Sequence, residues 1–505
     1  MTEMKKMAEG LNPLTGMDFP DPDVIRVGDT YYMISTTMHF FPGGIILQSH
    51  DLIHWEICSY IYDALEHTPG ETLEGEQTVY GHGMWAASLR YHEGKFYAVF
   101  IAHEWDRTFL FTADRIEGPW EKHYIEGIYH DPSLFFDDDG RAYIVYGNRD
   151  IRLTELKADL SGPKEGGFDQ VIVRDAPGDF LGYEGSHLYK IHGKYVLFLI
   201  HSLQYMWHRT QACFVTDDLG GVWAGGDVLC ADLDGMNSGP AQGGVVDTPD
   251  GKWFAVVFQD RGAVGRIPVL VPVTWNRNGY PVFGKVTKEI ENESTVPGWQ
   301  ARPLYADDDF TSPRLKDVWQ FNHEPREGCW ETGNGAYRIR TDKISRTVEF
   351  ARNTLTQRTI LPECAAEVTV DAEDLRDGDT AGICLLIGSY GLIGITREQG
   401  KVGLVMKARS PGEKEEKELA RIPLDEKTVR LRAEVRFDGA RGEVLFYWKN
   451  GEVWEPLGPV HTMRFMLDHF TGCRFGLYMY SAKEAGGSAA FRRFRYEPKP
   501  AAAAE

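Results

Sequence analysis

Residues 21–35 read DPDVIRVGDTYYMIS: an apolar stretch, a turn that closes on Gly28, and a second apolar stretch rich in aromatic residues. The pattern returns four times, as WAASLRYHEGKFYAVF (85–100), DPSLFFDDDGRAYIVY (131–146), EGSHLYKIHGKYVLFL (184–199) and QGGVVDTPDGKWFAVVF (242–258). Apolar and polar residues that alternate on both sides of a glycine turn are typical of an antiparallel hairpin. The first part of the chain therefore contains one β unit five times.

Most hairpins are followed by another apolar segment: IILQSHDLIHWE (45–56), FLFTADRIEGPWE (109–121), CFVTDDLGGVWA (213–224) and IPVLVPVTW (267–275). Each repeat can thus form a four-stranded sheet, which cannot bury both of its faces alone. Radial stacking around an axis solves this problem, so five repeats predict an all-β, five-bladed β-propeller over residues 11–284. No long amphipathic helix interrupts the series, which argues against Rossmann and TIM-barrel folds.

The repeat also aligns five positions that should face the central channel. Counting back nine residues from each turn glycine leads to Trp85, Asp131, Glu184 and Gln242, and in the first repeat, whose turn is two residues shorter, to Asp21. The innermost strands of a propeller line its channel, so three carboxylates should converge there. Carboxylates that converge without a metal repel one another, and one stays protonated near neutrality, as paired acid and base catalysis requires. The alternative is that they are ordinary turn or surface charges.

These segments resemble the family 43 glycoside hydrolases, five-bladed propeller enzymes that act on plant-wall pentose sugars. NPLTGMDFPDPDVIRVGDTYYM (12–33) is similar to the family's opening segment, which implies that Asp21 is the general base. HDPSLFFDDDG (130–140) is similar to the segment whose aspartate orients the acid and tunes its pKa, here Asp131. YEGSHLYK (183–190) is similar to the general-acid segment, here Glu184. The resemblance implies inverting hydrolysis, with the base and acid carboxyls roughly 6.5–9.5 Å apart.

Three further segments imply substrate-binding residues. GMWAASLRYHEGKFY (83–97) resembles the family's Trp-Ala-Pro-Ser segment, which makes Trp85 an apolar wall for the sugar, although Ala87 stands in place of Pro. GAVGRIPVLVPVTW (262–275) resembles the segment whose arginine binds a substrate hydroxyl, here Arg266. STTMHFFPGG (35–44) resembles a loop that helps to close the pocket, and it marks rim candidates. These candidates are Phe40, Phe41 and His39. As an alternative, the arginine could be simply ion-paired and the aromatic residues could fill core.

The fifth repeat departs from many relatives, which have a Gly-His-Gly or Gly-His-Ala segment where this chain reads AQGGVV. Gln242 replaces the axial histidine. Its amide can bind water or offer an oxygen to calcium, so we expect a substrate-binding role for it, no required cofactor, and room for a structural calcium. The run Asp137 to Gly140 lacks the ligand spacing of an EF-hand and is interpreted as a turn. The seven cysteines form no CxxC pair, and we expect buried, reduced thiols rather than a zinc site.

The amino-acid composition argues against several classes of binding partner. The net charge of −21 argues against binding to nucleic acid or to acidic membranes. No apolar run approaches the 18 or more residues of a membrane span. The N-terminal MTEMKKMAEG lacks the apolar core of a secretion signal, so a cytoplasmic location is expected. The sequence leaves open whether the protein forms a homo-oligomer.

The pattern changes after residue 284. Residues 285–304 are charged and are interpreted as a linker. A second strand series follows, in which TVRLRAEVRF (428–437) alternates apolar and polar residues, as in a sheet with one buried and one wet face. We expect a concanavalin-like β-sandwich of jelly-roll type over residues 305–498. It resembles the lectin-like C-terminal domain of one branch of family 43, and packing on the propeller is favoured over sugar binding.

The resemblance implies an exo-acting hydrolase of an oligosaccharide substrate, with terminal α-L-arabinofuranose or β-D-xylose released from plant-wall fragments such as those of arabinoxylan. Two alternatives stay open: an endo-acting arabinanase, which needs an open groove, and a non-catalytic carbohydrate-binding propeller.

Overall fold

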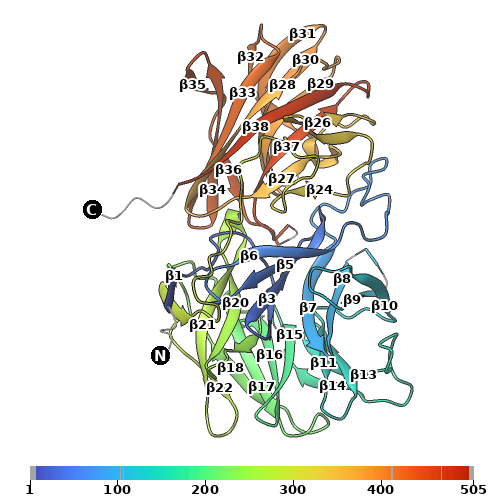
Figure 1. Ribbon diagram of the computed structural model, residues 1–505, viewed down its shortest axis with the longest axis vertical. Coiled ribbons are helices and arrows are strands. Elements are labelled where there is room, and N and C mark those ends of the chain that lie inside the picture. Colours follow the sequence, from blue (N-terminus) through green and yellow to red (C-terminus); the bar gives the residue numbers. More distant parts are fainter. Residues whose placement is uncertain are drawn as a thin grey trace.

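The computed structural model describes residues 7–102, 104–105, 107–176, 178, 180–410, 413–467 and 469–499. Figure 1 shows two all-β domains stacked along the long axis, with the blue-to-green N-terminal domain below the orange-to-red C-terminal one. The predicted fold class, a five-bladed propeller followed by a β-sandwich, is confirmed.

Each blade is an antiparallel sheet of four strands that follow one another along the chain. The blades are: β2 (Asp23–Val27), β3 (Thr30–Ser35), β5 (Gly43–Ser49) and β6 (Glu56–Tyr62); β7 (Met84–His92), β8 (Lys95–Ala102), β9 (Thr108–Ala113) and β10 (Glu121–Ile125); β11 (Ser133–Phe136), β12 (Ala142–Tyr146), β13 (Asp150–Leu156) and β14 (Asp169–Arg174); β15 (Glu184–Ile191), β16 (Lys194–Ser202), β17 (Arg209–Thr216) and β18 (Ala224–Leu229); β19 (Val245–Asp247), β20 (Trp253–Asp260), β21 (Arg266–Trp275) and β22 (Pro281–Phe283).

The apolar faces of consecutive blades bury one another. Separate hydrophobic clusters join the first blade to the second, the second to the third, the third to the fourth and the fourth to the fifth. Arg26 of the first blade donates to Asp247 of the fifth at 2.6 Å, where the ring closes. Beside the ring, β1 (Met7–Leu11) pairs with β23 (Glu289–Glu293), so the segment predicted as a linker contributes a strand.

The C-terminal domain packs two sheets face to face. One runs β32 (Lys417–Pro423), β31 (Lys401–Arg409), β30 (Tyr390–Glu398), β29 (Asp379–Leu386), β37 (Arg474–Ser481), β27 (Leu355–Arg358), β24 (Gln320–Asn322) and β4 (Phe40–Phe41). The other runs β25 (Trp330–Gly333), β26 (Ala336–Arg340), β38 (Ser488–Lys499), β28 (Glu363–Asp371), β33 (Thr428–Asp438), β34 (Arg441–Asn450) and β35 (Val453–Pro456), with β36 (His461–Arg464) also on β34. The predicted alternation holds in β33, whose apolar residues are all buried.

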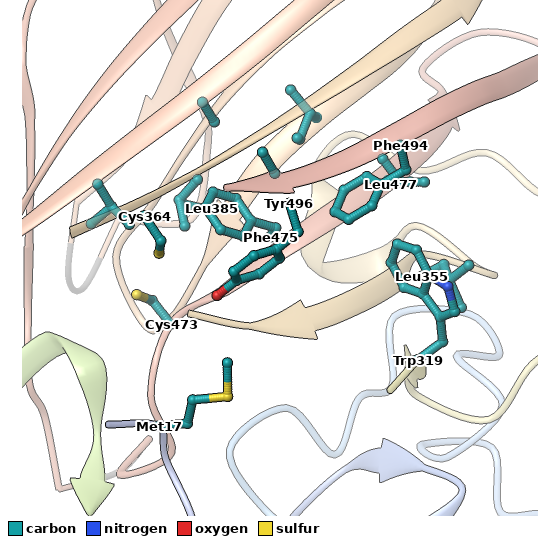
Figure 2. Packing of buried hydrophobic residues seen from close by; sticks show 14 of the residues in the cluster. Met17, Trp319, Leu355, Cys364, Leu385, Cys473, Phe475, Leu477, Phe494 and Tyr496 are labelled. Atoms are coloured by element: carbon teal, nitrogen blue, oxygen red, sulfur yellow. The ribbon is translucent and has the colours of Figure 1, made fainter. Parts of the chain in front are cut away.

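The two domains share one core. A single hydrophobic cluster includes Phe19 and Val264 of the propeller together with Leu355 and Phe475 of the sandwich. Figure 2 shows Met17, from the segment before the first blade, below the sandwich strands whose side chains fill this cluster. The strand β4 also leaves the propeller and pairs with β24 at the edge of a sandwich sheet. Interdomain motion is therefore opposed by apolar burial as well as by backbone hydrogen bonds.

A second junction lies where the short 3-10 helix η1 (Gly262–Val264) of the fifth blade meets the sandwich. Ala263 donates its N–H to Ala440 O at 3.1 Å and accepts from the N–H of Cys473 at 2.9 Å. The backbones approach so closely that a Cβ on Gly472 would lie 1.9 Å from Val264 O. Glycine is therefore required at position 472 to let the sandwich dock on this turn.

Five of the seven cysteines are buried free thiols, but Cys230 is exposed and Cys58 is partly exposed, so the prediction of uniform burial is wrong for these two. Cys58 lies on β6 and Cys230 directly follows β18, and both strands are the outermost of their blades. Among the described residues, no helix is long and apolar enough to span a bilayer.

A histidine cluster is buried where the domains meet. The rings of His323 and His469 lie 5.0 Å and 5.5 Å from that of His39, and all three side chains are at most 3% exposed. Burial lowers the pKa of His323 to about 3, and burial together with the nearby guanidinium of Arg474 lowers the pKa of His469 to about 3. Neither ring nitrogen of His469 has a hydrogen-bond partner among the described residues. The cluster is thus neutral at pH 7.

The substitution Gly472→Ala is expected to weaken the domain junction, because its Cβ meets the Val264 carbonyl. Forced overpacking typically costs about 1–3 kcal/mol, which would lower the midpoint of thermal unfolding. Gly226→Ala is the matched control, since a Cβ there meets nothing within 4 Å. Equal midpoints for the two variants in a thermal melt would show that the docking does not depend on Gly472.

Acid should destabilise the junction. An unfolded histidine binds a proton below pH 6.5, whereas His323 and His469 do so in the fold only near pH 3, so stability falls as the pH drops through this window. At pH 5 each contributes a loss of about 2 kcal/mol, from about 1.4 kcal/mol per pH unit. The melting midpoint of His469→Phe should therefore fall less between pH 7.5 and pH 5 than that of the wild type. The exposed His123→Phe serves as control, and an equal fall in His469→Phe and wild type would contradict the assignment.

Candidate active site

All five axial positions identified from the repeat reach one pocket of about 140 Å³ at the centre of the propeller. Arg266 joins them there. The remaining walls come from Ala86 of β7, from Arg209 at the start of β17, from loops between strands and from the sandwich. The full lining is Asp21, Trp85, Ala86, His130, Asp131, Leu181, Glu184, Trp207, Arg209, Gln242, Arg266, Leu467 and Phe470.

The axial residues lie at the starts of the innermost strands, with small differences between blades. Glu184 is the first residue of β15, whereas Asp21, Asp131 and Gln242 each stand two or three residues before their strand. These last three have positive φ values of 52°, 46° and 57°. Such a left-handed conformation is uncommon for a residue with a side chain, and it is tolerated best by Asn and Asp. The bent backbone gives these side chains a different direction from those of the strand that follows.

Asp21 is held at both of its oxygens. Arg266 Nη1 donates to Oδ1 at 2.7 Å, and Thr36 Oγ1 donates to Oδ2 at 2.6 Å. The hydroxyl of Thr36 itself accepts the N–H of Ala86 at 2.9 Å, so the second blade fixes it. Asp21 is only 4% exposed. Its carboxylate is therefore oriented and charge-paired before any substrate arrives.

Arg266 belongs to a buried row of alternating charges. Its Nε lies 3.2 Å from Asp260 Oδ1, and the other oxygen of Asp260 accepts from Arg209. Burial alone would raise the pKa of Asp260, but the two guanidinium groups hold it below its ordinary value. The four charged groups of this row are each at most 8% exposed, and their opposite charges compensate one another. They are Asp21, Arg266, Asp260 and Arg209.

Asp131 and Glu184 face a shared histidine. His130 Nε2 lies 3.4 Å from Glu184 Oε2 and 3.8 Å from Asp131 Oδ1. The charge of Asp131 raises the pKa of His130 to about 9 against the opposing effect of burial, so the imidazole is a cation at neutral pH. Burial raises the pKa of Asp131 above its ordinary value, and the neighbouring carboxyls add to the rise. Asn148 Nδ2 donates to Glu184 Oε2 at 2.6 Å, so His130 and Asn148 both face the same oxygen of this carboxyl.

Gly185 and Gln242 meet beside the acid segment. Gly185 has a φ of 63°, and a Cβ there would lie 2.8 Å from Gln242 Cγ. The side chain of Gln242 thus occupies the space that the glycine leaves open. Its backbone N–H donates to Gln211 Oε1 at 2.7 Å, which ties the fifth blade to the fourth.

The sandwich contributes one wall of the pocket. Phe470 packs edge-on against Trp85, with ring centroids 5.2 Å apart, and the guanidinium of Arg266 lies 4.0 Å from the Phe470 ring centroid. Leu467 stands beside it and is 53% exposed. An apolar surface of this kind can pack against the C–H face of a sugar ring, while the carboxylates can accept hydrogen bonds from its hydroxyls.

The predicted rim residues lie elsewhere. His39, Phe40 and Phe41 are at most 2% exposed and do not line the pocket. The two phenylalanines form β4, which pairs with β24 of the sandwich, and His39 Nε2 lies 3.0 Å from Asn322 Oδ1. The prediction for these three is corrected: they form part of the domain interface, because the sandwich covers the loop that they occupy.

Several pocket residues were not predicted from the sequence. His130 and Ala86 directly adjoin predicted residues in the chain, so their neighbours could have pointed to them. Trp207 and Arg209 follow the fourth hairpin, outside the repeat-equivalent positions. Phe470 lies in the other domain, and no spacing in the propeller repeat could have found it.

The described residues hold one cluster of three potential metal ligands within 4.8 Å of one another, His130, Asp131 and Glu184. Calcium takes six to eight oxygen ligands, and an imidazole does not supply one. The cluster therefore does not fit calcium, and the raised pKa of His130 means that a proton already balances the two carboxyls.

Comparison with known proteins agrees with this geometry. Residues 11–281 match the family "Glycosyl hydrolases family 43", and residues 307–497 match "Beta xylosidase C-terminal Concanavalin A-like domain". The β-xylosidase of Formosa agariphila is 25% identical over 562 residues, which cover 96% of this chain and 90% of the relative. The non-reducing end α-L-arabinofuranosidase of Bacteroides ovatus is 27% identical over 431 residues, 78% of each chain.

Among solved structures, a bifunctional GH43-CE protein of Bacteroides eggerthii superposes with a TM-score of 0.89 at 38% identity. The match covers 98% of this chain but 64% of that one, so this chain corresponds to only part of that protein. The resemblance seen in the sequence is confirmed, and the chain belongs to family 43 of the glycosyl hydrolases.

Proposed function

We propose that this protein is an exo-acting, inverting glycoside hydrolase that releases a terminal pentose, α-L-arabinofuranose or β-D-xylose, from plant-wall oligosaccharides such as arabinoxylan fragments. The observation that carries the proposal is a pocket of about 140 Å³ that holds three carboxyls. A cavity of about 150 Å³ accepts a benzene ring, so this pocket has room for one sugar ring. Relatives named β-xylosidase and non-reducing end α-L-arabinofuranosidase support the choice of sugar.

Asp21 is the proposed general base. Its two oxygens accept from Arg266 and Thr36, which orients the carboxylate toward a water that attacks the anomeric carbon. The water gives its proton to Asp21 as its oxygen bonds to that carbon. Arg266 therefore has a positioning role for the base in addition to any contact with a sugar hydroxyl.

Glu184 is the proposed general acid. Asn148 and His130 both face its Oε2, which leaves Oε1 to carry the proton that goes to the leaving-group oxygen. Asp131 and the cationic His130 set the charge around this carboxyl. The N–H of Gly185 donates to Asp131 Oδ2 at 3.1 Å, so Asp131 also holds the backbone next to Glu184.

The sandwich wall supports exo action over the endo-acting alternative. An endo enzyme must accommodate sugars on both sides of the cleaved bond in an open groove. Here Phe470 and Leu467 from the second domain line the pocket, and Phe470 packs against Trp85. Three carboxyls in one sugar-sized pocket also favour catalysis over binding alone, since a binding module needs no acid and base.

Glu184→Ala should fold normally and lose about 10²–10⁴-fold in turnover of a natural pentoside, because no general acid remains. Turnover should recover in part with a dinitrophenyl leaving group, which departs without a proton. Comparing hydrolysis of nitrophenyl α-L-arabinofuranoside with that of nitrophenyl β-D-xylopyranoside shows which pentose the enzyme releases. Proton NMR of the first product should show the inverted anomer. Glu121→Ala, on the outer strand β10, is the control. Wild-type turnover by Glu184→Ala, or a retained anomer, would contradict the mechanism.

His130→Gln should lower kcat/KM about 10–100-fold, the equivalent of about 1.5–3 kcal/mol for a hydrogen bond to a charged group. Since the pKa of His130 is raised to about 9, wild-type activity should fall as the pH rises through that value and the cation is lost. The variant should lack this fall near pH 9, whereas the loss of activity that follows ionisation of the general acid Glu184 should remain. His123→Gln, which is half exposed on β10, should keep both rate and profile. An unchanged alkaline limb in His130→Gln would show that another group causes it.

A further inference from the structure

Two buried arginines stand opposite each other at the domain junction, outside the lining of the catalytic pocket. Arg358 ends β27 and Arg474 begins β37, and the two residues are paired across these antiparallel strands. Cross-strand partners point to the same face of a sheet. Phe475, labelled in Figure 2, belongs to the sandwich core, so its neighbour Arg474 points away from that core, toward the propeller. Two like charges are thus held side by side out of water.

The two guanidinium groups share one acceptor. Arg358 Nη1 and Arg474 Nη1 donate to Gln320 Oε1 at 2.9 Å and 2.8 Å. The amide of Gln320 is fixed in this orientation, because its Nε2 donates to the carbonyl of Pro42 at 2.7 Å. An amide oxygen carries no net charge, so this contact brings the two guanidinium groups together without compensating either of them.

Several buried donors at this junction have no acceptor. Arg358 donates its Nε–H to the backbone carbonyl of Asp18 at 2.9 Å. Its Nη2, and both Nε and Nη2 of Arg474, have no hydrogen-bond partner in the part of the chain that the structure describes. The same holds for Asn322 Nδ2, two residues beyond Gln320 on β24 and therefore on the same face of that strand. A buried donor without an acceptor carries a penalty that an added acceptor would remove.

Asp18 supplies negative charge to both guanidinium groups, but its carboxylate does not bond to either one. Its Oδ1 accepts the backbone N–H of Arg266 at 2.8 Å, and its Oδ2 has no partner among the described residues. Burial raises the pKa of Asp18 to about 6, so this group is ionised at pH 7. It therefore contributes one negative charge from a distance.

The remaining groups at the junction do not complete the balance. Burial lowers the pKa of both arginines, and the charge of Arg358 lowers that of Arg474 further, but a guanidinium stays charged in a protein. Tyr60 also faces Arg358 and stays neutral, because burial raises its pKa to about 12. Two positive charges thus face the single negative charge of Asp18, and an uncompensated buried charge is strongly destabilising.

We propose that a small monovalent anion of the size of chloride binds between Arg358 and Arg474 and completes the junction of the two domains. One negative charge brings the local sum of Arg358, Arg474 and Asp18 to zero. The anion also accepts from the arginine N–H groups that lack a partner. Because the cost of taking an ion out of water rises steeply with its charge, burial favours a monovalent anion over sulfate or phosphate.

Aromatic rings limit where the anion can bind. The ring centroid of Phe40 lies 3.5 Å from the guanidinium carbon of Arg474, and that of Phe19 lies 4.6 Å from the guanidinium carbon of Arg358. A ring therefore covers a flat face of each guanidinium group. The edges, where the N–H groups point, are left for a ligand, and a spherical ion can accept from the edges of both groups.

Thermal melts at pH 7.5 test the proposal, with sodium chloride replacing sodium gluconate at constant ionic strength. The unfolding midpoint of the wild type should rise by roughly 1–3 °C between 1 and 100 mM chloride and then level off, because the anion binds the folded state. Arg474→Met removes one of the two positive charges and should abolish this rise. Gln320→Glu places a carboxylate at the shared acceptor and should abolish it too. Arg464→Met, exposed on β36, is the matched control and should keep it.

A second measurement does not depend on the variants. Wild-type crystals soaked in sodium bromide should show an anomalous diffraction peak between the guanidinium groups of Arg358 and Arg474. Equal midpoints in chloride and gluconate, together with no such peak, would mean that water fills the space and would overturn the inference. A chloride effect that persists in both Arg474→Met and Gln320→Glu would also overturn it, by placing the anion elsewhere. No sugar enters these tests, so their outcome is separate from that of the proposed function.

Discussion

The guanidinium of Arg266 is the interaction on which the site depends. It pairs with Asp21 and Asp260, both buried, and Asp260 in turn pairs with Arg209. Breaking a buried pair by removing one partner leaves an uncompensated charge, which typically costs about 3–5 kcal/mol. Because Arg266 belongs to the fifth blade and Asp21 precedes the first, the same contact links the closing blades of the ring. It also places the proposed base at a defined point on the axis.

The sandwich completes this arrangement from outside the propeller. The turn η1 ends just before Arg266, and its Ala263 carbonyl accepts a hydrogen bond from the backbone N–H of Cys473. Phe470, three residues before Cys473, packs over the guanidinium of Arg266. The same segment, residues 470–473, therefore both docks the domains and builds the pocket wall. The shared hydrophobic core and the pairing of β4 with β24 make the second domain a structural part of the site.

The repeat explains why so much of the site was predictable. A five-fold pattern aligns equivalent residues, and radial symmetry brings equivalent residues to the axis, so Asp21, Asp131 and Glu184 could be found without coordinates. The candidates His39, Phe40 and Phe41 came instead from the resemblance of residues 35–44 to a pocket-closing loop, and that prediction failed, because aromatic side chains suit a sugar rim and a buried interface equally well. Pattern alone cannot separate these, because exposure depends on which other segment covers the loop.

The sequence by itself determined the blade count, the alternation of the sandwich strands and the identity of the axial residues, because each follows from periodicity along the chain. Only the tertiary structure decided that His130 bridges two carboxyls, that Arg266 holds the base as part of a row of charges, and that Phe470 closes the pocket. These contacts join residues with no common period, some from different domains. Their distances arise from the packing of whole sheets, which no local pattern encodes.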